Sequence, residues 1–358
     1  MRRYLITITD QNDVPKIIKV QGLTFNGIFT STDPSGLLTI PGAYNIEMGL
    51  NVSVLNSPMD GSFLRIYGVG LPLISQAAQF NPVWSKIPGK DKYCKIQIFA
   101  GMARGLPLAN PNQFGLVASG IIQQAFGNWE GTSQTLDFVL MSPIDNTPPD
   151  PINISFSCQQ GEALAPQIAK SLKIAFQKRN NGKGFPVIVD INPGLVATEE
   201  ITHVQFNTQS FATFLNSLSL GMIQTPNYSG IQVFYNDDSI YVSDYSVPAT
   251  KKPTQIKFND LIGQPTWISP NTIAFKTVMR GDLRIGDQIL MPQQLPQGGS
   301  ISSYVINTAQ SLSQYRSSSV FQGEFNVQSL RHLGMFRQAD ATSWVTVVYA
   351  WSPTAIPS

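Results

Sequence analysis

Two blocks of short alternating segments, separated by one stretch with a helical period, set the strongest limit on how this chain of 358 residues can fold. In residues 4–145, apolar and polar residues alternate, and Gly and Pro interrupt the pattern at short intervals. Such alternation is typical of strands that bury one face. From Thr254 the same pattern returns. We therefore expect a mainly β protein with a small α+β insert.

The middle stretch predicts two amphipathic helices and one hairpin. The first helix, over residues 162–176, tolerates Pro166 only in its first turn, and the second has Ser210 as its expected N-cap and ends at Gly221. A turn at 236–238 joins two short strands. The apolar positions that define the helices are Leu164, Ile168, Leu172 and Phe176 in the first, and Phe211, Phe214, Leu215 and Leu218 in the second.

Proline and glutamine content marks the expected domain limits. Three prolines between Asp145 and Pro151 cannot continue the interior of a sheet, so a boundary is expected there. We predict a first β-barrel domain over residues 1–150, an α+β insert over 151–250, and a second β-barrel domain over 251–358. The last domain contains residues 292–320, which are rich in Gln, Ser and Gly and predict a long loop.

The best-defined hairpin is GIIQQAFGNWEGTSQTLDFVL, residues 120–140, and a weakly similar segment occurs near the C-terminus. Aligning Gly127 with Gly334 matches Phe126 to Leu333 and Trp129 to Phe336, with one extra residue after the second turn. This repeat suggests two related antiparallel β-barrels, because closure removes exposed strand edges.

Within this first hairpin, Phe126 and Trp129 are expected to pack a barrel corner. Gly127 and Gly131 are expected to permit the bend. The returning strand should direct Leu136, Phe138 and Leu140 to one side.

Composition excludes several classes of protein. Charged residues make up 13% of the chain, about half of the usual ~25%, and the net charge of +2 is too small for binding nucleic acid by phosphate neutralisation. No apolar run approaches the ~20 residues of a membrane span, and MRRYLITITDQ predicts a first strand and not a signal peptide. Cys94 and Cys158 are too few for a disulfide framework or a four-thiolate site; two buried thiols are favoured over one bridge.

Residues that could support catalysis are few and scattered. His203 and His332 are the only histidines, and no zinc-binding spacing surrounds them. The pairs at 199–200 and 237–238 have adjacent carboxylates, which point to opposite faces in a strand, and a turn explains the second pair better. A Ser-His-Asp triad stays open, although no nucleophile elbow is present. We predict no enzymatic activity, no catalytic residues, no cofactor-binding residues and no metal site.

Three other short features have structural explanations. Gly68-Val-Gly70 follows a strand without a third glycine or a helix, so a phosphate loop is not expected. Arg280-Gly281-Asp282 is expected to form a tight turn. The five tryptophans are expected in the core or at interfaces in preference to a sugar-binding surface: Trp84, Trp129, Trp267, Trp344 and Trp351.

Three stretches together resemble the baseplate hub proteins of contractile-tailed phages and related phage-tail-like particles. They are the hairpin at 120–140, the segment LIGQPTWISPNTIAFKTVMRGDLRIGDQILMP at 261–292, and VQSLRHLGMFRQADATSWVTVVYA at 327–350. The layout of the middle unit is similar as well. No lysozyme-like domain and no spike helix accompany them.

The resemblance implies two tail-tube-like barrels in each chain and a homotrimeric ring with pseudo-sixfold symmetry. Such a ring adapts a sixfold tail tube to a threefold central spike. The implied partners are further copies of this chain, the tube or tube-initiator protein, the spike, the baseplate wedge proteins and the tape measure protein. No membrane anchor and no sequence-specific nucleic acid are expected. The implied location is the virion, after assembly in the host cytoplasm. A carbohydrate-binding or adhesin-type β-sandwich is the alternative, and a hydrolase comes third.

Overall fold

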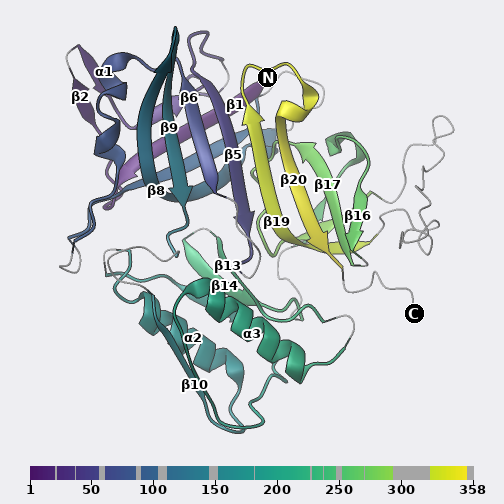
Figure 1. Cartoon of the computed structure of the whole chain (residues 1–358). Helices are drawn as coiled ribbons and strands as arrows, with labels where there is room; N and C mark the ends of the chain where they lie inside the picture. Colours follow the sequence, from purple (N-terminus) through teal and green to yellow (C-terminus); the bar gives the residue numbers. More distant parts are fainter. Residues whose placement is uncertain are drawn as a thin grey trace, which may run out of the picture.

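The computed structural model describes most of the chain, and three blocks of elements follow one another along it (Figure 1). The described residues are all except 21, 37, 56–60, 86–89, 104–110, 145–151, 181, 226–227, 237, 247–251, 270, 293–322 and 353–358. The predicted boundary at 145–151 therefore lies outside the described residues, as does the predicted loop 292–320 beyond Pro292, and the division into three domains stays a prediction.

The first block is mainly β, as its alternating sequence predicts. The described strands are β1 (Arg2–Asp10), β2 (Ile18–Val20), β3 (Leu23–Phe25), β4 (Ile28–Thr30), β5 (Asn45–Ser53), β6 (Ser62–Tyr67), β7 (Cys94–Met102), β8 (Gly115–Glu130) and β9 (Ser133–Met141). The short helices are α1 (Leu71–Ile74), η1 (Ala77–Phe80) and η2 (Pro111–Gln113). The expectation that no helix follows Gly68-Val-Gly70 is wrong, because α1 begins at Leu71 with Pro72 in its first turn.

The second block has the predicted mixture of helices and strands. Its elements are β10 (Ile154–Cys158), α2 (Leu164–Phe176), β11 (Val187–Asp190), β12 (Ile201–Gln205), α3 (Thr208–Met222), β13 (Gln232–Asn236) and β14 (Ser239–Ser243). Both predicted helices are confirmed, and the four apolar positions of the first are fully buried. No helix in the described ranges is both long and apolar enough to cross a membrane.

The predicted N-cap of the second helix is wrong. The helix begins at Thr208, and Asn207 is its N-cap, with the Oδ1 atom accepting a hydrogen bond from Ser210 N at 2.6 Å. Asn and Ser are comparably good N-caps. Asn207 is favoured here because Thr208, the first helical residue, is buried and donates through Oγ1 to Ile144 O at 2.9 Å.

The third block returns to β structure. Its elements are β15 (Thr254–Gln255), η3 (Phe258–Asp260), β16 (Thr266–Ser269), β17 (Thr272–Val278), β18 (Gln288–Leu290), β19 (Glu324–Met335), η5 (Ala341–Ser343) and β20 (Trp344–Trp351). The mainly antiparallel β class with an α+β insert is confirmed.

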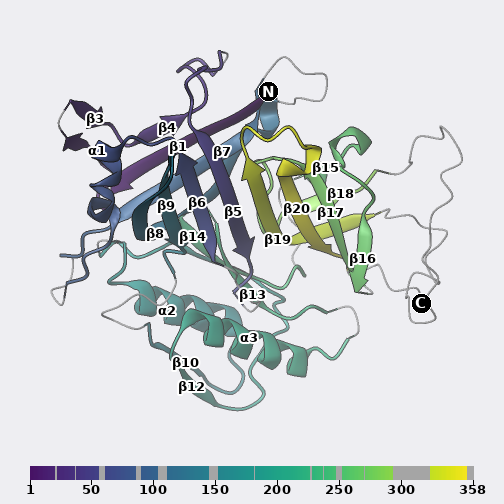
Figure 2. The same ribbon diagram turned by 45° about the horizontal axis from the view of Figure 1, so that its top comes forward.

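The two β blocks share one sheet of 13 strands. Its main order is β16-β17-β20-β19-β5-β6-β9-β8-β7-β1-β4, and β18 and β15 branch from β19. The blocks join where β19 pairs antiparallel with β5, from Ser329 opposite Ser53 to Met335 opposite Glu47. Figures 1 and 2 show these strands side by side, with the insert below them.

The sheet contains the same five-strand unit twice. In the first block the order is β5-β6-β9-β8-β7, and in the third it is β16-β17-β20-β19-β18, with every neighbouring pair antiparallel. Gly127 lies opposite Leu136, and Gly334 lies opposite Trp344. The second hairpin therefore contains one more residue between the paired positions. Both aligned glycines thus lie in the first strand of their hairpin.

Separate cores stabilise the units. The first block folds so that β1 and β7 face β5, β6 and β9, and Ile6, Ile98, Met48, Leu64 and Phe138 meet in one buried cluster. A second cluster fills the α+β insert, and a third lies in the last block. Each fully buried side chain of this size contributes about 1.5–3 kcal/mol of hydrophobic stabilisation. Cys94 and Cys158 lie in different cores as buried free thiols.

Candidate functional site

The side chains weighed for catalysis lie on separate elements. His203 lies on β12, where its ring contacts Phe214 with the centroids 4.8 Å apart. His332 lies on β19. Glu200 accepts a hydrogen bond from Gln159 Nε2 at 3.2 Å, and Asp238 accepts one from the Tyr235 hydroxyl at 2.7 Å. Within the described ranges, no group of three or more His, Cys, Asp or Glu residues could hold a metal ion.

His332 is a buried, neutral part of the core. Its Nδ1 atom lies 2.9 Å from Thr346 Oγ1 on the neighbouring strand. Burial lowers the pKa of His332 to about 3, and the positive charge of Arg284 lowers it further in the same direction. The ring therefore stays uncharged at neutral pH and serves as a hydrogen-bonding spacer between β19 and β20.

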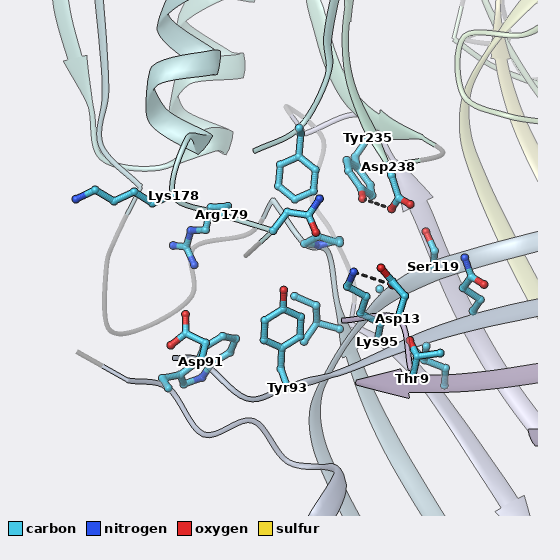
Figure 3. Close-up of a pocket in the computed structure, with 18 residues that line it drawn as sticks. Thr9, Asp13, Asp91, Tyr93, Lys95, Ser119, Lys178, Arg179, Tyr235 and Asp238 are labelled. Atoms are coloured by element: carbon cyan, nitrogen blue, oxygen red, sulfur yellow. Dashed lines mark hydrogen bonds and ion pairs between the residues drawn. The ribbon is translucent and has the colours of Figure 1, made fainter. Parts of the chain in front are cut away.

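A cleft of about 380 Å³ separates the first β block from the α+β insert (Figure 3). The sheet contributes residues of β1, β7 and β8 and of the segments before β2 and β7. The insert contributes the segment that follows α2 and the hairpin of β13 and β14. The labelled polar lining is Thr9, Asp13, Asp91, Tyr93, Lys95, Ser119, Lys178, Arg179, Tyr235 and Asp238.

Charges of both signs line this cleft, and several are already paired. Lys95 Nζ donates to Asp13 Oδ1 at 2.8 Å. Burial raises the pKa of Tyr93 to about 12, and the carboxylates of Asp91 and Asp13 act in the same direction, while Arg179 opposes them. The Trp84 and Tyr93 rings lie 5.8 Å apart. This lining could hold a small polar ligand with a ring face, but it presents no activated nucleophile.

The Arg280-Gly281-Asp282 tripeptide forms a buried link between the two β blocks. Arg280 donates from Nε and Nη2 to the two carboxylate oxygens of Asp282, each at 2.7 Å, and its Nη1 lies 3.6 Å from Asp260 Oδ2. Gly281 N donates to Gln113 O of the first block at 2.8 Å. Because the Arg280 side chain is only 3% exposed, it is not available as an adhesion motif.

The face of the sheet opposite the core carries a row of polar side chains. Glu47, Arg65 and Asp137 lie opposite one another on β5, β6 and β9. Arg65 Nε donates to Asp137 Oδ1, and the Tyr67 hydroxyl donates to Glu47 Oε2 at 2.6 Å. The side chains of this self-paired row are thus held by two hydrogen-bonded pairs on the outer face.

The tip of the β8–β9 hairpin corrects two sequence predictions. Phe126 and Trp129 do not pack a barrel corner; they are 42% and 66% exposed. Phe126 lies opposite Asp137, on the outer face, and not toward the core. Gly127 does not permit the bend either: it lies within β8 opposite Leu136, where its missing side chain leaves room for Ile74. The expectations for Gly131, with a φ of 57°, and for the buried Leu136, Phe138 and Leu140 hold.

The remaining tryptophans are mostly covered, as expected. Trp344 and Trp351 are buried. Trp267 packs against Phe325 with the ring centroids 5.9 Å apart. The cleft itself was missed, because its lining comes from segments up to about 230 residues apart and no local motif connects them.

Comparisons with known proteins give distant similarities over nearly the whole chain. The 43 kDa tail protein of prophage MuSo2 from Shewanella oneidensis is 10% identical, with a TM-score of 0.46, over 100% of this chain and 99% of that one. The tail protein from Neisseria meningitidis MC58 is 9% identical, with a TM-score of 0.43, over 99% of each chain. Prophage tail protein gp18 from Listeria monocytogenes EGD-e is 9% identical, with a TM-score of 0.36, over 97% and 94%. No protein-family model and no curated protein sequence matches.

Proposed function

We propose that this chain is a non-enzymatic structural hub of a phage tail baseplate, located in the virion after assembly in the host cytoplasm. Three copies form a ring with pseudo-sixfold symmetry, which adapts the sixfold tail tube to a threefold central spike. The single observation that supports this most is the five-strand unit that occurs twice in one chain. A chain with two like units presents six like units when three copies assemble, and closed rings are the usual outcome of repeated interfaces.

The composition fits a protein that buries much of its surface against other protein. Charged residues are scarce, at 13%, and an amide or hydroxyl costs less to bury than a charge. The self-paired row Glu47, Arg65 and Asp137 lies on the sheet face opposite the core. In the proposed ring this face lines the central channel, where the tape measure protein would pass.

Electron micrographs of the purified chain, mixed with tail tube or spike protein, test this proposal. We expect rings with a central hole, which attach to one end of the tube and, on the other side, to the spike. Single compact particles that attach to neither would contradict it. Tail tube protein without the hub chain is the matched control.

A carbohydrate-binding role for a virion protein is the second candidate, and the cleft favours it. Trp84 and Tyr93 place two ring faces beside the carboxylates of Asp91 and Asp13, an arrangement suited to stacking and hydrogen bonding with a sugar. A glycan array probed with the native chain and with Trp84→Ala distinguishes the two functions. Binding that is lost in the variant, by a chain that stays a monomer, would favour the carbohydrate role.

A further inference from the structure

The row of strands that joins the two β blocks ends in two edges beside which no described strand lies. The row is β16-β17-β20-β19-β5-β6-β9-β8, and β16 and β8 lie at its opposite ends in Figure 1. Among the described strands, β16 pairs with β17 alone. β7 pairs with β8 only as far as Ile121, so Gln123–Glu130 has β9 on one side and no described strand on the other.

The junction inside the chain shows how such edges can meet. The part of β19 that corresponds to Gln123–Glu130 of β8 pairs with β5, which is the counterpart of β16. Arg331 lies opposite Asn51 at this junction, and Leu333 lies opposite Gly49. Within the described residues, the C-terminal half of β8 therefore has no strand on its outer edge, whereas its repeat pairs there with β5.

Cross-strand partners establish which residues correspond. Ala125 and His332 precede the aligned glycines by two positions, and they lie opposite Phe138 and Thr346. Phe138 lies opposite Leu64, and Thr346 lies opposite Thr277.

Those central residues in turn have matched outer partners. Leu64 lies opposite Met48, and Thr277 lies opposite Leu261. Leu261 is thus the counterpart of Met48. Two extra residues lie between Leu261, opposite Thr277, and Thr266, opposite Ala274, so Thr266 is the counterpart of Asn51. In the same way, Gln124 is the counterpart of Arg331.

We propose that the Gln123–Glu130 edge of one copy docks antiparallel on the 261–269 edge of a second copy, with Gln124 opposite Thr266. This inference rests on the proposed ring and names its interface. The directions agree: strands alternate along the whole row of eight, so a second row placed at its end continues the alternation. The contact joins unlike surfaces, and such head-to-tail interfaces form rings when the rotation closes.

Exposed apolar side chains accompany both edges. Phe126 and Trp129 on the first are 42% and 66% exposed, and Phe258 and Ile268 beside the second are 39% and 55% exposed. At the internal junction the counterparts are covered: Phe336, aligned with Trp129, packs against Tyr4 and Trp344 and donates through its backbone N to Ile46 O at 2.9 Å.

The single chain also shields the β8 edge, as proteins commonly do with unpaired strands. Asn81 Oδ1 accepts a hydrogen bond from Ala125 N, so that backbone donor points away from β9. Ile74 lies over Gly127: a Cβ there would be 2.1 Å from Ile74 Cγ2. At the internal junction Met48 of β5 covers Gly334 in the same manner: a Cβ on Gly334 would lie 2.6 Å from Met48 Cε. Docking along Gln123–Glu130 therefore has to replace the Asn81 hydrogen bond at Ala125 and pass beside Ile74.

Cysteine crosslinking of the whole chain tests the interface. Gln124 and Thr266 are both exposed, so Gln124→Cys/Thr266→Cys should fold normally. Directly opposed residues have Cβ atoms about 4.5–5.5 Å apart, within the adjustment that a disulfide needs. Under mild oxidation we expect this variant to form covalent dimers and trimers, separable on a denaturing gel without reductant, in at least half of the chains.

Matched pairs provide the controls. Asn51→Cys/Arg331→Cys should crosslink inside one chain and leave its mass unchanged. Gln97→Cys/Thr266→Cys, which uses an exposed glutamine on β7, should yield few covalent multimers. A trimer by light scattering without crosslinks at Gln124 and Thr266 would overturn this interface and leave the proposed ring standing. A chain that stays monomeric would overturn both.

Discussion

The two hairpins of the sheet, β8–β9 and β19–β20, have the same strand order and aligned glycines, yet differ in what surrounds them. The second hairpin lies in the middle of the row, where β5 covers its outer edge. The first lies at the end of the row and keeps Phe126 and Trp129 exposed. The same local structure therefore pairs with a further strand on its outer edge in one place, and has no described strand there in the other.

The residues that fill the hairpins also differ. In the first, Ala125 lies opposite Phe138, whose ring meets Phe80 edge to face with the centroids 5.3 Å apart. In the second, the same two positions are His332 and Thr346, which contact each other through polar atoms. The first hairpin is stabilised by a large apolar side chain, and the second by a buried polar pair.

The largest effect is expected from truncating the apolar member of the first hairpin. Phe138→Ala removes a fully buried ring that also contacts Phe80, and should lower the free energy of unfolding by about 3–5 kcal/mol. Chemical denaturation measures this. A loss below about 1 kcal/mol would show that the ring is not a main support of this hairpin.

A smaller effect is expected from the polar pair of the second hairpin. Thr346→Val keeps the side-chain shape but removes the hydroxyl that meets His332 Nδ1 and accepts from Arg280 N at 3.1 Å. Leaving buried polar groups unsatisfied costs about 1–3 kcal/mol. Thr346→Ser, which retains the hydroxyl, should lose less; equal losses for both variants would mean that packing alone is measured.

The second hairpin should also make stability depend on pH, because it contains the buried His332. His332 has a folded pKa of about 3, lowered from 6.5 by burial, so the unfolded chain binds more protons between these values. The contribution of His332 to the free energy of unfolding is fully present above pH 6.5. It decreases as the pH falls toward 3, by at most about 1.4 kcal/mol per pH unit. Denaturation between pH 7 and 5 should show this slope, and His332→Gln should flatten it. An unchanged slope in the variant would assign the effect to other groups.

The smallest effect on a single chain is expected at the exposed tip. Trp129→Ala should change the unfolding free energy of the monomer by no more than about 0.5 kcal/mol, because the side chain is 66% exposed. Phe336→Ala, its matched variant, should cost several times more, since that ring contacts Tyr4 and Trp344. If both variants lowered the free energy of unfolding by similar amounts, at a concentration where the chain is monomeric, the proposed difference between the two hairpin tips would be contradicted.

Sequence reasoning predicted elements with strong local patterns. The four-residue spacing of Leu164, Ile168, Leu172 and Phe176 predicted α2, and the alternation in β9 predicted which side chains are buried. It missed α1, because four residues are too few to show a helical period. It placed the cap of α3 three residues too late, since Asn207 and Ser210 suit that position about equally.

Long-range pairing was beyond local patterns. The repeat suggested two related barrels, but nothing in β5 or β19 alone indicates that residues 47–53 lie beside residues 329–335. The exposure of Phe126 and Trp129 was not predicted for the same reason. Aromatic residues are usually buried, and only the position of β8 at the end of the row explains why these are not.

The molar mass of the purified chain in solution tests the central claim most directly. Light scattering coupled to size exclusion, at micromolar concentration and physiological salt, should give about three times the mass of one chain, with a single narrow species. A mass equal to one chain, or two, at every concentration examined would contradict a threefold ring built from this repeated sheet.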